Sequence, residues 1–383
     1  MSLSDRRHLS SNRILYRIKC KIRAMLSAIQ RCFGSCSRDW LGEGDGKQRQ
    51  KVSSSILASP LLKSCGITAA DVDANLDDYM DVSNHMCANL GINMSRMSEA
   101  EAARIYQYYL PVYVWCETQR KEHVRRRGAG KRTPLVLGIS APQGCGKSTL
   151  CEQLESLFEY KGLRAASVSI DDFYLTRNDH VKMSGKHAGN RILETRGNAG
   201  THDVKLGTET LRALKAGNGG TIALPRYDKS AFQGKGDRAD PSTWPTVEGP
   251  VDVVLFEGWM LGFAAVPDKD AARVDPDLKV VNGFLRAYKN AWDQYCDAWL
   301  IIKVANPEYS HKWRLEAEKR MRAAGKPAMT DEEVEAFVDR FMPAYKCYLP
   351  GLYANGPTTA RIKDGNVLTV AVDASRSPMA EQE

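Results

Sequence analysis

The 383-residue chain lacks several features that would mark it as a member of other protein classes. Its ten cysteines include no Cys-x-x-Cys pair and no cluster with histidine, which argues against a structural zinc site or a secreted disulfide framework and favours a reducing compartment. No apolar run approaches the roughly 20 residues that a transmembrane helix needs, so we expect no membrane partner. The chain also has no internal repeat and no Asn-Lys-x-Asp string of the kind that reads guanine.

The positive charge of the chain is confined to its N-terminus. The formal net charge is +8, but residues 1–38 alone carry nine Lys or Arg and a single acid, Asp5, so the remainder is neutral overall. A neutral body makes nucleic acid an unexpected partner. The same residues are amphipathic, rich in Arg and Ser and poor in acids, which is typical of an organelle transit peptide. A solvated basic tail is the alternative.

Composition and periodicity divide the chain into regions. Residues 42–55 are polar and rich in Gly and Ser, which predicts a flexible linker. Residues 69–89 and 98–127 show apolar side chains at helical spacing. The expected regions are a transit peptide with linker (1–55), a helical extension (56–130), an α/β domain (131–375) and a disordered tail (376–383).

The most informative segment, L-V-L-G-I-S-A-P-Q-G-C-G-K-S-T-L, spans residues 135–150. It combines a short apolar run, typical of a buried strand, with a glycine-containing loop and the start of a helical pattern. This is the order that a phosphate-binding loop requires. The first glycine of the G-x-x-x-x-G-K-[ST] pattern is replaced by Ala141. An ordinary glycine-rich connection between strand and helix is the alternative.

The loop contains the groups that hold a nucleotide triphosphate. Gly144 and Gly146 let backbone N–H groups face phosphate oxygens, Lys147 supplies a positive charge, and the Ser148 hydroxyl can hold Mg²⁺ beside a helix N-terminus. The candidate nucleotide-binding residues are Ala141, Pro142, Gln143, Gly144, Cys145, Gly146, Lys147, Ser148 and Thr149.

Strand-type and helical segments alternate along the rest of the domain. Strands are expected near residues 135–139, 165–170, 221–224, 251–256, 298–304 and 367–372, and long helices over 307–324 and 331–348. This alternation predicts an α/β fold with a mostly parallel sheet and helices on both faces. Ligands are then expected at the carboxyl ends of the strands.

Acidic residues follow two of these strands. Asp171 and Asp172 come after the strand at 165–170, and Glu257 ends the most apolar strand of the chain. One such carboxylate can orient Mg²⁺, while another can accept a proton from an attacking hydroxyl, as phosphoryl transfer requires. A helix N-cap is the alternative role for the aspartate pair. Glu257 would be costly to bury without a cation or a hydrogen-bond partner.

The strings S-I-D-D-F-Y (169–174) and L-F-E-G (255–258) resemble those of the uridine kinase, pantothenate kinase and phosphoribulokinase group of P-loop kinases. The resemblance implies the P-loop NTPase fold, a three-layer αβα sandwich, with ATP and Mg²⁺ as cofactors. It implies Asp171 as the base toward the substrate hydroxyl and Glu257, with Ser148, as a Mg²⁺ ligand. Lys147, Asp171 and Glu257 are therefore the catalytic candidates.

Several strings in order, from G-I-S-A-P-Q-G-C-G-K-S-T-L to F-M-P-A-Y-K-C-Y-L-P-G-L-Y, are similar to the plant and fungal D-glycerate 3-kinase family across about residues 100–375. This resemblance implies ATP-dependent phosphorylation of D-glycerate at its 3-hydroxyl, giving 3-phosphoglycerate and ADP. For plant members it implies photorespiration in the chloroplast, with mitochondrion or cytoplasm as alternative locations. We expect a monomer.

Other functions remain open at this point. A kinase of uridine, pantothenate or ribulose 5-phosphate would use the same chemistry, and a nucleotide-dependent switch without transfer to a small molecule is the alternative from another class.

A glycerate site needs fixed cations and hydrogen-bonding groups, because glycerate carries a carboxylate and hydroxyls. The candidate substrate-binding residues are Asp171, Tyr174, Arg196, His202, Asp203, Arg226, Tyr227, Lys229 and Arg238. The helix after Pro307 resembles the lid of small-molecule kinases, in which cations cover the transferred phosphoryl group. Arg314 and Arg322 are its candidate contacts, and a solvated helix with Glu and Lys pairs is the alternative.

Overall fold

The computed structural model describes residues 43–128, 133–325 and 328–380. The chain divides into two compact units, residues 1–52 and 53–383. Of the first unit only residues 43–52, within helix α2 (Glu43–Leu57), are described, so the predicted transit peptide lies outside the described residues. The sheet and the candidate site discussed below lie in the second unit.

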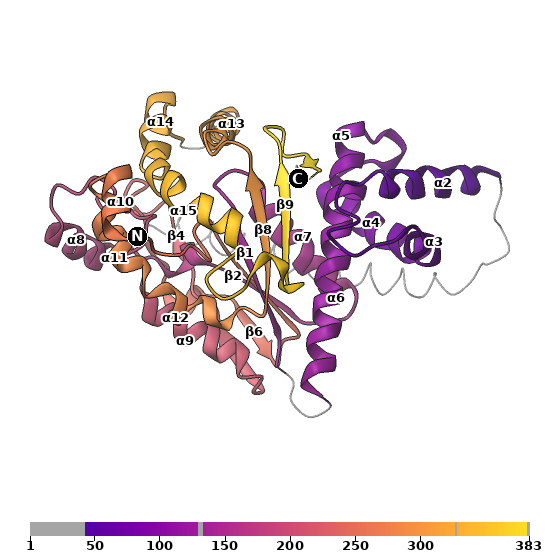
Figure 1. Cartoon of the computed structure of the whole chain (residues 1–383), viewed down its shortest axis with the longest axis horizontal. Coiled ribbons are helices and arrows are strands. Elements are labelled where there is room, and N and C mark those ends of the chain that lie inside the picture. Colours follow the sequence, from indigo (N-terminus) through magenta and orange to yellow (C-terminus); the bar gives the residue numbers. More distant parts are fainter. Residues whose placement is uncertain (1–42, 129–132, 326–327, 381–383) are drawn as a thin grey trace, which may run out of the picture. The chain divides into compact units, whose positions relative to one another are not determined.

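A six-stranded sheet forms the centre of the second unit, in the order β10-β9-β8-β1-β7-β2 (Figure 1). β10 runs antiparallel to β9 and the other neighbours are parallel, which confirms the predicted mostly parallel sheet. β1 and β7 are buried along their whole length, as expected for strands covered on both faces. The strands are β1 (Leu135–Ser140), β2 (Ala165–Ser169), β7 (Val253–Gly258), β8 (Ala298–Val304), β9 (Val367–Val372) and β10 (Pro378–Met379).

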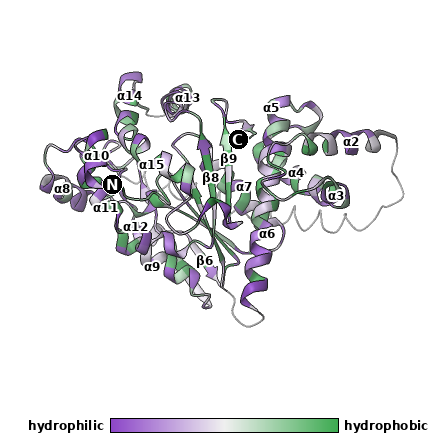
Figure 2. Ribbon diagram, viewed as in Figure 1, coloured by the Kyte–Doolittle hydropathy of each residue, from purple (hydrophilic) through white to green (hydrophobic). Residues whose placement is uncertain are grey.

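Helices cover both faces of the sheet, so the predicted three-layer α/β architecture is confirmed. α6 (Leu110–Arg127) and α7 (Lys147–Tyr160) pack on one face, against β1, β2 and β7. On the other face, alternate strand residues such as Val254 and Phe256 enter a large apolar core with the helices between β7 and β8. Figure 2 shows mainly hydrophobic central strands and a hydrophilic helix α8 (Arg177–Lys186).

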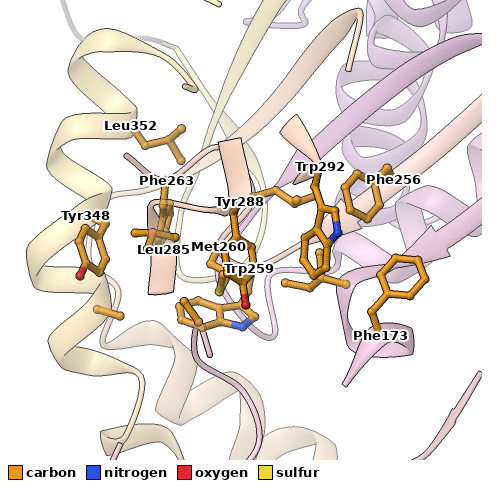
Figure 3. Close-up of a cluster of buried hydrophobic side chains, with 14 of the residues drawn as sticks. Phe173, Phe256, Trp259, Met260, Phe263, Leu285, Tyr288, Trp292, Tyr348 and Leu352 are labelled. Atoms are coloured by element: carbon orange, nitrogen blue, oxygen red, sulfur yellow. The ribbon is translucent and has the colours of Figure 1, made fainter. Parts of the chain in front are cut away.

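Trp292 is fully buried in this core, between Tyr288 and the rings of Phe173 and Phe256 (Figure 3). Its ring centroid lies 5.6 Å from that of Phe173, 6.0 Å from that of Phe256 and 4.8 Å from that of Tyr288. Phe173 follows β2 and Phe256 belongs to β7, so Trp292 packs against both strand ends that carry the acidic candidates. Replacement of such a buried aromatic by Ala typically costs about 3–5 kcal/mol of stability.

A helical region precedes β1, and the helices expected within residues 69–89 and 98–127 are present. α3 and α5 each begin with a capping box, made by Thr68 with Asp71 and by Ser98 with Glu101. The elements here are α3 (Ala69–Ala74), α4 (Leu76–Leu90), η1 (Met94–Arg96), α5 (Glu99–Ala102), the π-helical turn η2 (Ala103–Tyr109) and α6.

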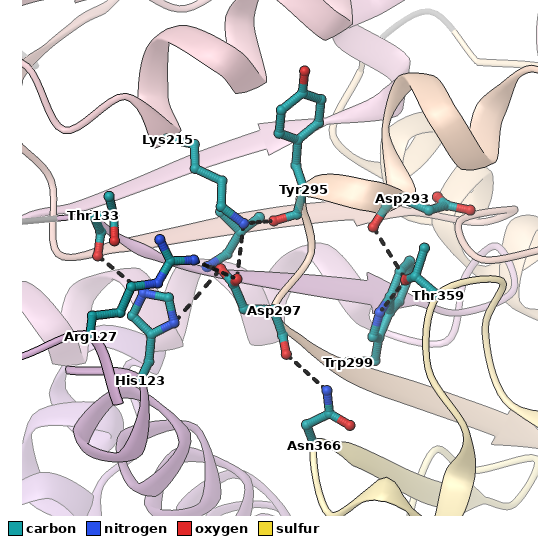
Figure 4. Close-up of polar contacts among 11 residues, drawn as sticks. His123, Arg127, Thr133, Lys215, Asp293, Tyr295, Asp297, Trp299, Thr359 and Asn366 are labelled. Carbon is teal, nitrogen blue, oxygen red and sulfur yellow. Dashed lines mark hydrogen bonds and ion pairs between the residues drawn. The ribbon is translucent and has the colours of Figure 1, made fainter. Parts of the chain in front are cut away.

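Asp297, just before β8, joins α6 to the sheet at the amino ends of the strands (Figure 4). Its carboxylate accepts hydrogen bonds from the Lys215 ammonium at 2.9 Å and from the Val136 backbone N–H at 3.0 Å. Arg127 and His123 of α6 approach the same carboxylate at 3.7 and 3.9 Å. These contacts fix the edge of the sheet opposite to the acidic candidates.

The chain between β2 and β7 forms small elements outside the main sheet. The strand predicted at 221–224 exists, but it pairs with β6 in a separate antiparallel sheet. β4 and β5 form a second small hairpin that sequence periodicity did not predict, because two-residue strands show no alternation. The elements are η3 (Ile170–Phe173), α8 (Arg177–Lys186), α9 (Val204–Lys215), β3 (Gly220–Ala223), β4 (Tyr227–Asp228), β5 (Asp237–Arg238), η4 (Pro241–Thr243) and β6 (Thr246–Gly249).

The helix predicted over residues 331–348 is two helices. The chain bends at Arg340 and Phe341, and Pro343 lies in the first turn of the second helix, where a missing N–H costs nothing. The remaining elements are α10 (Asp268–Val274), α11 (Leu278–Leu285), α12 (Tyr288–Ala291), η5 (Asp293–Tyr295), α13 (Tyr309–Ala323), α14 (Asp331–Asp339), α15 (Met342–Asn355) and η6 (Ile362–Asp364).

Two segments differ from the flexibility predicted for them. The expected linker at 42–55 is largely helical, because the K-Q-R-Q-K run within α2 consists of strong helix formers that outweigh the neighbouring Gly and Ser. The expected disordered tail at 376–383 contributes β10, which pairs with Ala371 and Val372 of β9. Short-range turn contacts, described below, hold this hairpin in place.

No helix among the described residues has the length and apolar character needed to cross a membrane. The seven cysteines in the described part of the chain are free thiols, and five of them are buried.

Candidate active site

The register of three parallel strands places the predicted catalytic groups at one edge of the sheet. Glu257 of β7 pairs with Ile139 of β1 on one side and with Ser169 of β2 on the other. The phosphate loop begins directly after β1, and Asp171 follows β2 by two residues. The loop and both acids therefore meet at the carboxyl ends of the strands, as the α/β pattern predicts.

The loop backbone has the conformation that its glycines allow. Gly144 and Gly146 have φ angles of 80° and 94°, in the left-handed region, and α7 begins at Lys147 immediately afterwards. Ala141 is buried, its N–H donates to the Gly258 carbonyl at 3.3 Å, and its φ is not positive. The methyl group in place of the usual first glycine is therefore accommodated without backbone strain.

Three residues outside the loop fix its position. The Gln143 N–H donates to the Tyr345 hydroxyl at 2.9 Å, and the Gly144 carbonyl accepts from Arg376 Nε at 2.8 Å. A Cβ atom on Gly144 would lie 2.6 Å from the Cβ of Trp313, so α13 packs directly against the loop backbone. Because the Gln143 N–H is already paired, this loop amide is not free to bind a phosphate oxygen.

Lys147 forms an ion pair with Glu257. Both side chains are largely buried, with exposed fractions of 14% and 10%. Burial alone would lower the pKa of Lys147, but the Glu257 carboxylate raises this pKa above its ordinary value. The lysine at the end of the loop is therefore positively charged, and its present partner is the predicted metal ligand.

Asp171 and Asp172, adjacent in sequence, have different partners. Asp171 accepts hydrogen bonds from the Tyr174 hydroxyl at 2.8 Å and from Lys229 Nζ at 2.5 Å. Asp172 accepts from the Ser169 N–H at 3.1 Å in a capping box. Ser169, not either aspartate, is the N-cap of η3; Asp172 is the third helical residue of its capping box, while Asp171 faces the candidate substrate residues.

The surroundings keep Asp171 ionised. Burial alone would raise the pKa of Asp171, but the Lys229 ammonium, together with Lys147 and the Tyr174 hydroxyl, holds it well below its ordinary value. Lys147 therefore interacts electrostatically with Asp171 as well as with Glu257. The two acid–lysine pairs form one charged centre.

Most of the predicted substrate residues gather around Tyr174. Its ring stacks on that of His202 at 4.7 Å and meets Tyr227 edge-on at 5.2 Å. Arg238 donates to the Tyr174 carbonyl at 3.2 Å and to Asp203 at 2.9 Å. The structure thus joins Asp171, Tyr174, His202, Asp203, Tyr227, Lys229 and Arg238 in one contiguous group.

Two buried nitrogen atoms in this group have no hydrogen-bond partner among the described residues: Nε2 of His202 and Nε of Arg238. The other ring nitrogen of His202 lies 2.9 Å from the Tyr288 hydroxyl. Burial lowers the pKa of His202 to about 4, so the ring is neutral at pH 7. Unpaired buried polar atoms are uncommon and costly, and a polar ligand would satisfy them.

Arg196 is joined to this group through the backbone. Its guanidinium donates to the carbonyls of Gly234 and Lys235 at 2.8 and 2.6 Å and to that of Lys229 at 3.4 Å. It also lies 5.5 Å from the ring centroid of Tyr227. Arg196 therefore holds the loop between β4 and β5, from which Lys229 reaches Asp171.

Three of the candidate arginines form ion pairs with carboxylates other than Asp171 and Glu257. Arg226 contacts Asp172, at 3.4 Å, rather than Asp171. On α13, Arg314 pairs with the buried Glu318 at 2.5 Å, and Arg322 pairs with Asp331 of α14. The side chain of α13 that touches the phosphate loop is Trp313.

Sequence reasoning missed Tyr345, Trp313 and Arg376. Tyr345 belongs to the F-M-P-A-Y string that carried the family resemblance, which was the available signal. Trp313 looks like an ordinary core residue of an amphipathic helix, and Arg376 lies in the segment expected to be disordered. Neither offered a motif.

The donor set at this edge suits Mg²⁺. The Ser148 hydroxyl and the Glu257 carboxylate are hard oxygen ligands, and Mg²⁺ in kinases is usually held by one or two protein groups together with substrate phosphates. Within the described residues no group of three or more His, Cys, Asp or Glu could form a metal cage by itself. The residues therefore fit a metal that arrives with the nucleotide.

Comparison with known proteins places these features in a family. The model of the phosphoribulokinase/uridine kinase family matches residues 136–349. The chain is 47% identical over 327 residues to the chloroplastic D-glycerate 3-kinase of Arabidopsis thaliana, covering 85% of this chain and 71% of that protein. It is 35% identical to a probable ATP-dependent kinase of Saccharomyces cerevisiae, over 65% of this chain and 88% of that one. The solved structure of D-glycerate 3-kinase from Cryptococcus neoformans matches with a TM-score of 0.62 at 32% identity, covering 71% of this chain and 97% of that chain.

Proposed function

Because the chain belongs to the phosphoribulokinase/uridine kinase family, we propose that it transfers the γ-phosphoryl group of ATP to the 3-hydroxyl of D-glycerate, giving 3-phosphoglycerate and ADP. It is a kinase that uses ATP and acts on a small molecule. The observation that carries the proposal is the pair of acid–lysine contacts, Lys147 with Glu257 and Lys229 with Asp171, at the mouth of the phosphate loop.

Asp171 acts as the base in this mechanism. Its neighbours keep it as a carboxylate, and the Tyr174 hydroxyl fixes one of its oxygens at 2.8 Å. The other carboxylate oxygen of Asp171 is paired with Lys229. This oxygen accepts the proton of the substrate 3-hydroxyl while the hydroxyl oxygen attacks the γ-phosphorus. A substrate carboxylate would draw the Lys229 ammonium, whose side chain is 59% exposed, away from Asp171.

Lys147 and the available loop N–H groups hold the phosphates. When a nucleotide binds, Lys147 would exchange the Glu257 carboxylate for phosphate oxygens, and Glu257 and Ser148 would be the residues that hold Mg²⁺. The metal, when bound, neutralises negative charge on the phosphates. The transferred group is thereby positioned by charges already present at the edge of the sheet.

The acceptor is proposed from chemistry as well as from relatives. Glycerate offers a carboxylate and hydroxyls, and the group around Tyr174 offers the Lys229 ammonium, the Arg238 guanidinium with its unpaired Nε, and the neutral His202 with its unpaired Nε2. These donors match an acidic polyol of small size. The relative from Arabidopsis carries the name D-glycerate 3-kinase, which supports the same acceptor.

A panel of acceptors tests the proposal. Acceptor-dependent ADP release is measured with D-glycerate, L-glycerate, uridine, pantothenate and ribulose 5-phosphate. D-glycerate should give the highest kcat/KM, by at least about a hundredfold over the other compounds. A higher kcat/KM for another acceptor would overturn the substrate assignment. Nucleotide binding without acceptor-dependent ADP release would favour the switch alternative.

We propose a plastid location and a role in photorespiration. The basic, acid-poor residues 1–38 support a transit peptide, and the Arabidopsis relative is described as chloroplastic. Residues 1–55 fused to a fluorescent protein in leaf cells should direct it to chloroplasts. Fluorescence in mitochondria or the cytoplasm would contradict this location.

A further inference from the structure

The carboxy-terminal hairpin of the sheet reaches the phosphate loop through one side chain, Arg376. Its Nε donates to the Gly144 carbonyl at 2.8 Å, and a terminal nitrogen pairs with Glu316 of α13 at 3.0 Å. The guanidinium also lies 5.1 Å from the ring centroid of Trp313. The Trp313 indole N–H in turn donates to the Ala374 carbonyl at 2.9 Å. Loop, α13 and hairpin are therefore joined at one point.

The backbone at Arg376 has an unusual conformation. Its φ of 68° lies in the left-handed region that residues other than glycine rarely adopt. The Asp373 carboxylate organises the turn, since it accepts hydrogen bonds from the Ser375 and Ser377 N–H groups at 2.8 and 2.9 Å. Strained backbone of this kind persists where its surroundings determine it, and it is frequent at functional sites.

The contact with Gly144 determines how one loop peptide is oriented. In a trans peptide the Gly144 carbonyl and the Cys145 N–H point in opposite directions. Arg376 holds the carbonyl toward the hairpin, so the Cys145 N–H points away from the hairpin. This orientation matters because the amide two residues earlier, that of Gln143, is already bonded to the Tyr345 hydroxyl.

We propose that Arg376 is a positioning residue for ATP: it fixes the Gly144–Cys145 peptide so that the Cys145 N–H is presented to a nucleotide phosphate, and it couples this peptide to α13 through Glu316 and Trp313. The inference rests on the proposed function only in that the loop binds ATP. It does not depend on the identity of the acceptor.

The test compares Arg376→Gly with Arg376→Lys. Glycine accepts the left-handed φ, so Arg376→Gly removes the guanidinium without adding backbone strain. The dissociation constant for ATP, measured by calorimetry without acceptor, should rise about tenfold, since the loss of a charge-assisted contact and of peptide orientation is of that order. The KM for ATP should rise in parallel, while the KM for D-glycerate and the melting temperature should stay close to the wild-type values.

Arg376→Lys should recover part of the affinity, because an ammonium reaches Gly144 or Glu316 but does not replace the planar fork that contacts both. Lys363→Ala is the matched control. It removes the same charge from η6, beside β9, at an exposed position, and should leave the ATP dissociation constant unchanged.

An ATP dissociation constant of Arg376→Gly within twofold of the wild type would overturn the inference. So would a loss of melting temperature that parallels the loss of affinity and is not relieved in Arg376→Lys, because Arg376 would then act on stability alone. If Arg376→Gly does not fold, unchanged ATP affinity of Arg376→Lys overturns the proposal and weakened affinity supports it. A wild-type protein that binds ATP but does not phosphorylate D-glycerate would refute the proposed function while leaving this comparison valid.

Discussion

Lys229 Nζ lies 2.5 Å from Asp171 Oδ2, although the two residues are 58 positions apart in the sequence. The contact joins the β4–β5 loop to the end of β2, and it sets the charge state of the proposed base. With Lys147 and the Tyr174 hydroxyl, Lys229 holds the pKa of Asp171 below its ordinary value. The chemistry of the proposed reaction depends on this pair.

The first prediction concerns the base. Asp171→Asn should lower kcat by about 10² to 10⁴-fold, because amide oxygen cannot accept the proton, while the dissociation constant for ATP changes little. Steady-state ADP release and calorimetry measure the two effects. Asp172→Asn is the matched control, since its side chain completes the capping box of η3 and an amide oxygen can still accept the Ser169 N–H. Full activity of Asp171→Asn would remove the base assignment.

The second prediction is a shift in pH dependence. In the wild type the pKa of Asp171 is held below its ordinary value, so the carboxylate stays ionised and contributes no loss of activity between about pH 5 and 8. In Lys229→Met, burial acts without the opposing ammonium and raises this pKa. The acid limb of the kcat/KM profile, which reports groups of the free enzyme, should therefore move to higher pH.

Lys229→Arg keeps a cation and should return the acid limb toward its wild-type position. An identical acid limb in wild type and Lys229→Met would show that Lys229 does not control the ionisation of Asp171.

The third prediction separates Arg196 from direct substrate binding. Its donors are occupied by the carbonyls of Lys229, Gly234 and Lys235. Arg196→Ala should loosen this loop and raise the KM for the acceptor by about tenfold, with little change in the KM for ATP. Arg191→Ala, which removes an arginine that pairs with Asp275, is the control and should change neither. An increase confined to the KM for ATP would contradict the loop role.

The fourth prediction concerns stability. Burial raises the pKa of Asp293 to about 7, and the Thr358 hydroxyl at 2.5 Å opposes this only partly. The folded state thus binds this proton more tightly than the unfolded state, so its contribution to stability is present below the unfolded pKa and is lost as pH rises through about 7. The free energy of unfolding should fall by up to about 4 kcal/mol as Asp293 loses its proton, at roughly 1.4 kcal/mol for each unit of pKa.

Asp293→Asn cannot ionise, so it should lose less stability than the wild type between about pH 5 and 8. Chemical denaturation at both pH values measures this difference. Equal losses in the two proteins would show that Asp293 does not titrate in this range.

The sequence predicted the residues of the site that directly follow a strand along the chain. Glu257 and Asp171 could be placed because each follows an apolar run, and parallel strands end at the same edge of a sheet. The contacts between loops could not be predicted in this way. Nothing in the spacing of Lys229 indicates that it reaches Asp171, and nothing in Arg196 distinguishes a loop anchor from a carboxylate ligand.

The same limit applies to α13 and the C-terminus. Periodicity predicted the helix but not the side chain that faces the loop, so the arginines were selected for their charge, whereas Trp313 makes the contact. Arg376 follows the last predicted strand in a short polar segment, which composition assigns to disorder. Its position depends on turn hydrogen bonds to Asp373, and these are invisible to periodicity.

The two acid–lysine contacts also have a consequence for how the substrates enter the site. With Lys147 on Glu257 and Lys229 on Asp171, the charges of each pair compensate one another. Entry of the nucleotide and of the acid substrate then becomes an exchange of counterions, in which each arriving anion takes a lysine and releases a carboxylate. In the proposed mechanism, each substrate thereby releases the carboxylate needed for its own reaction.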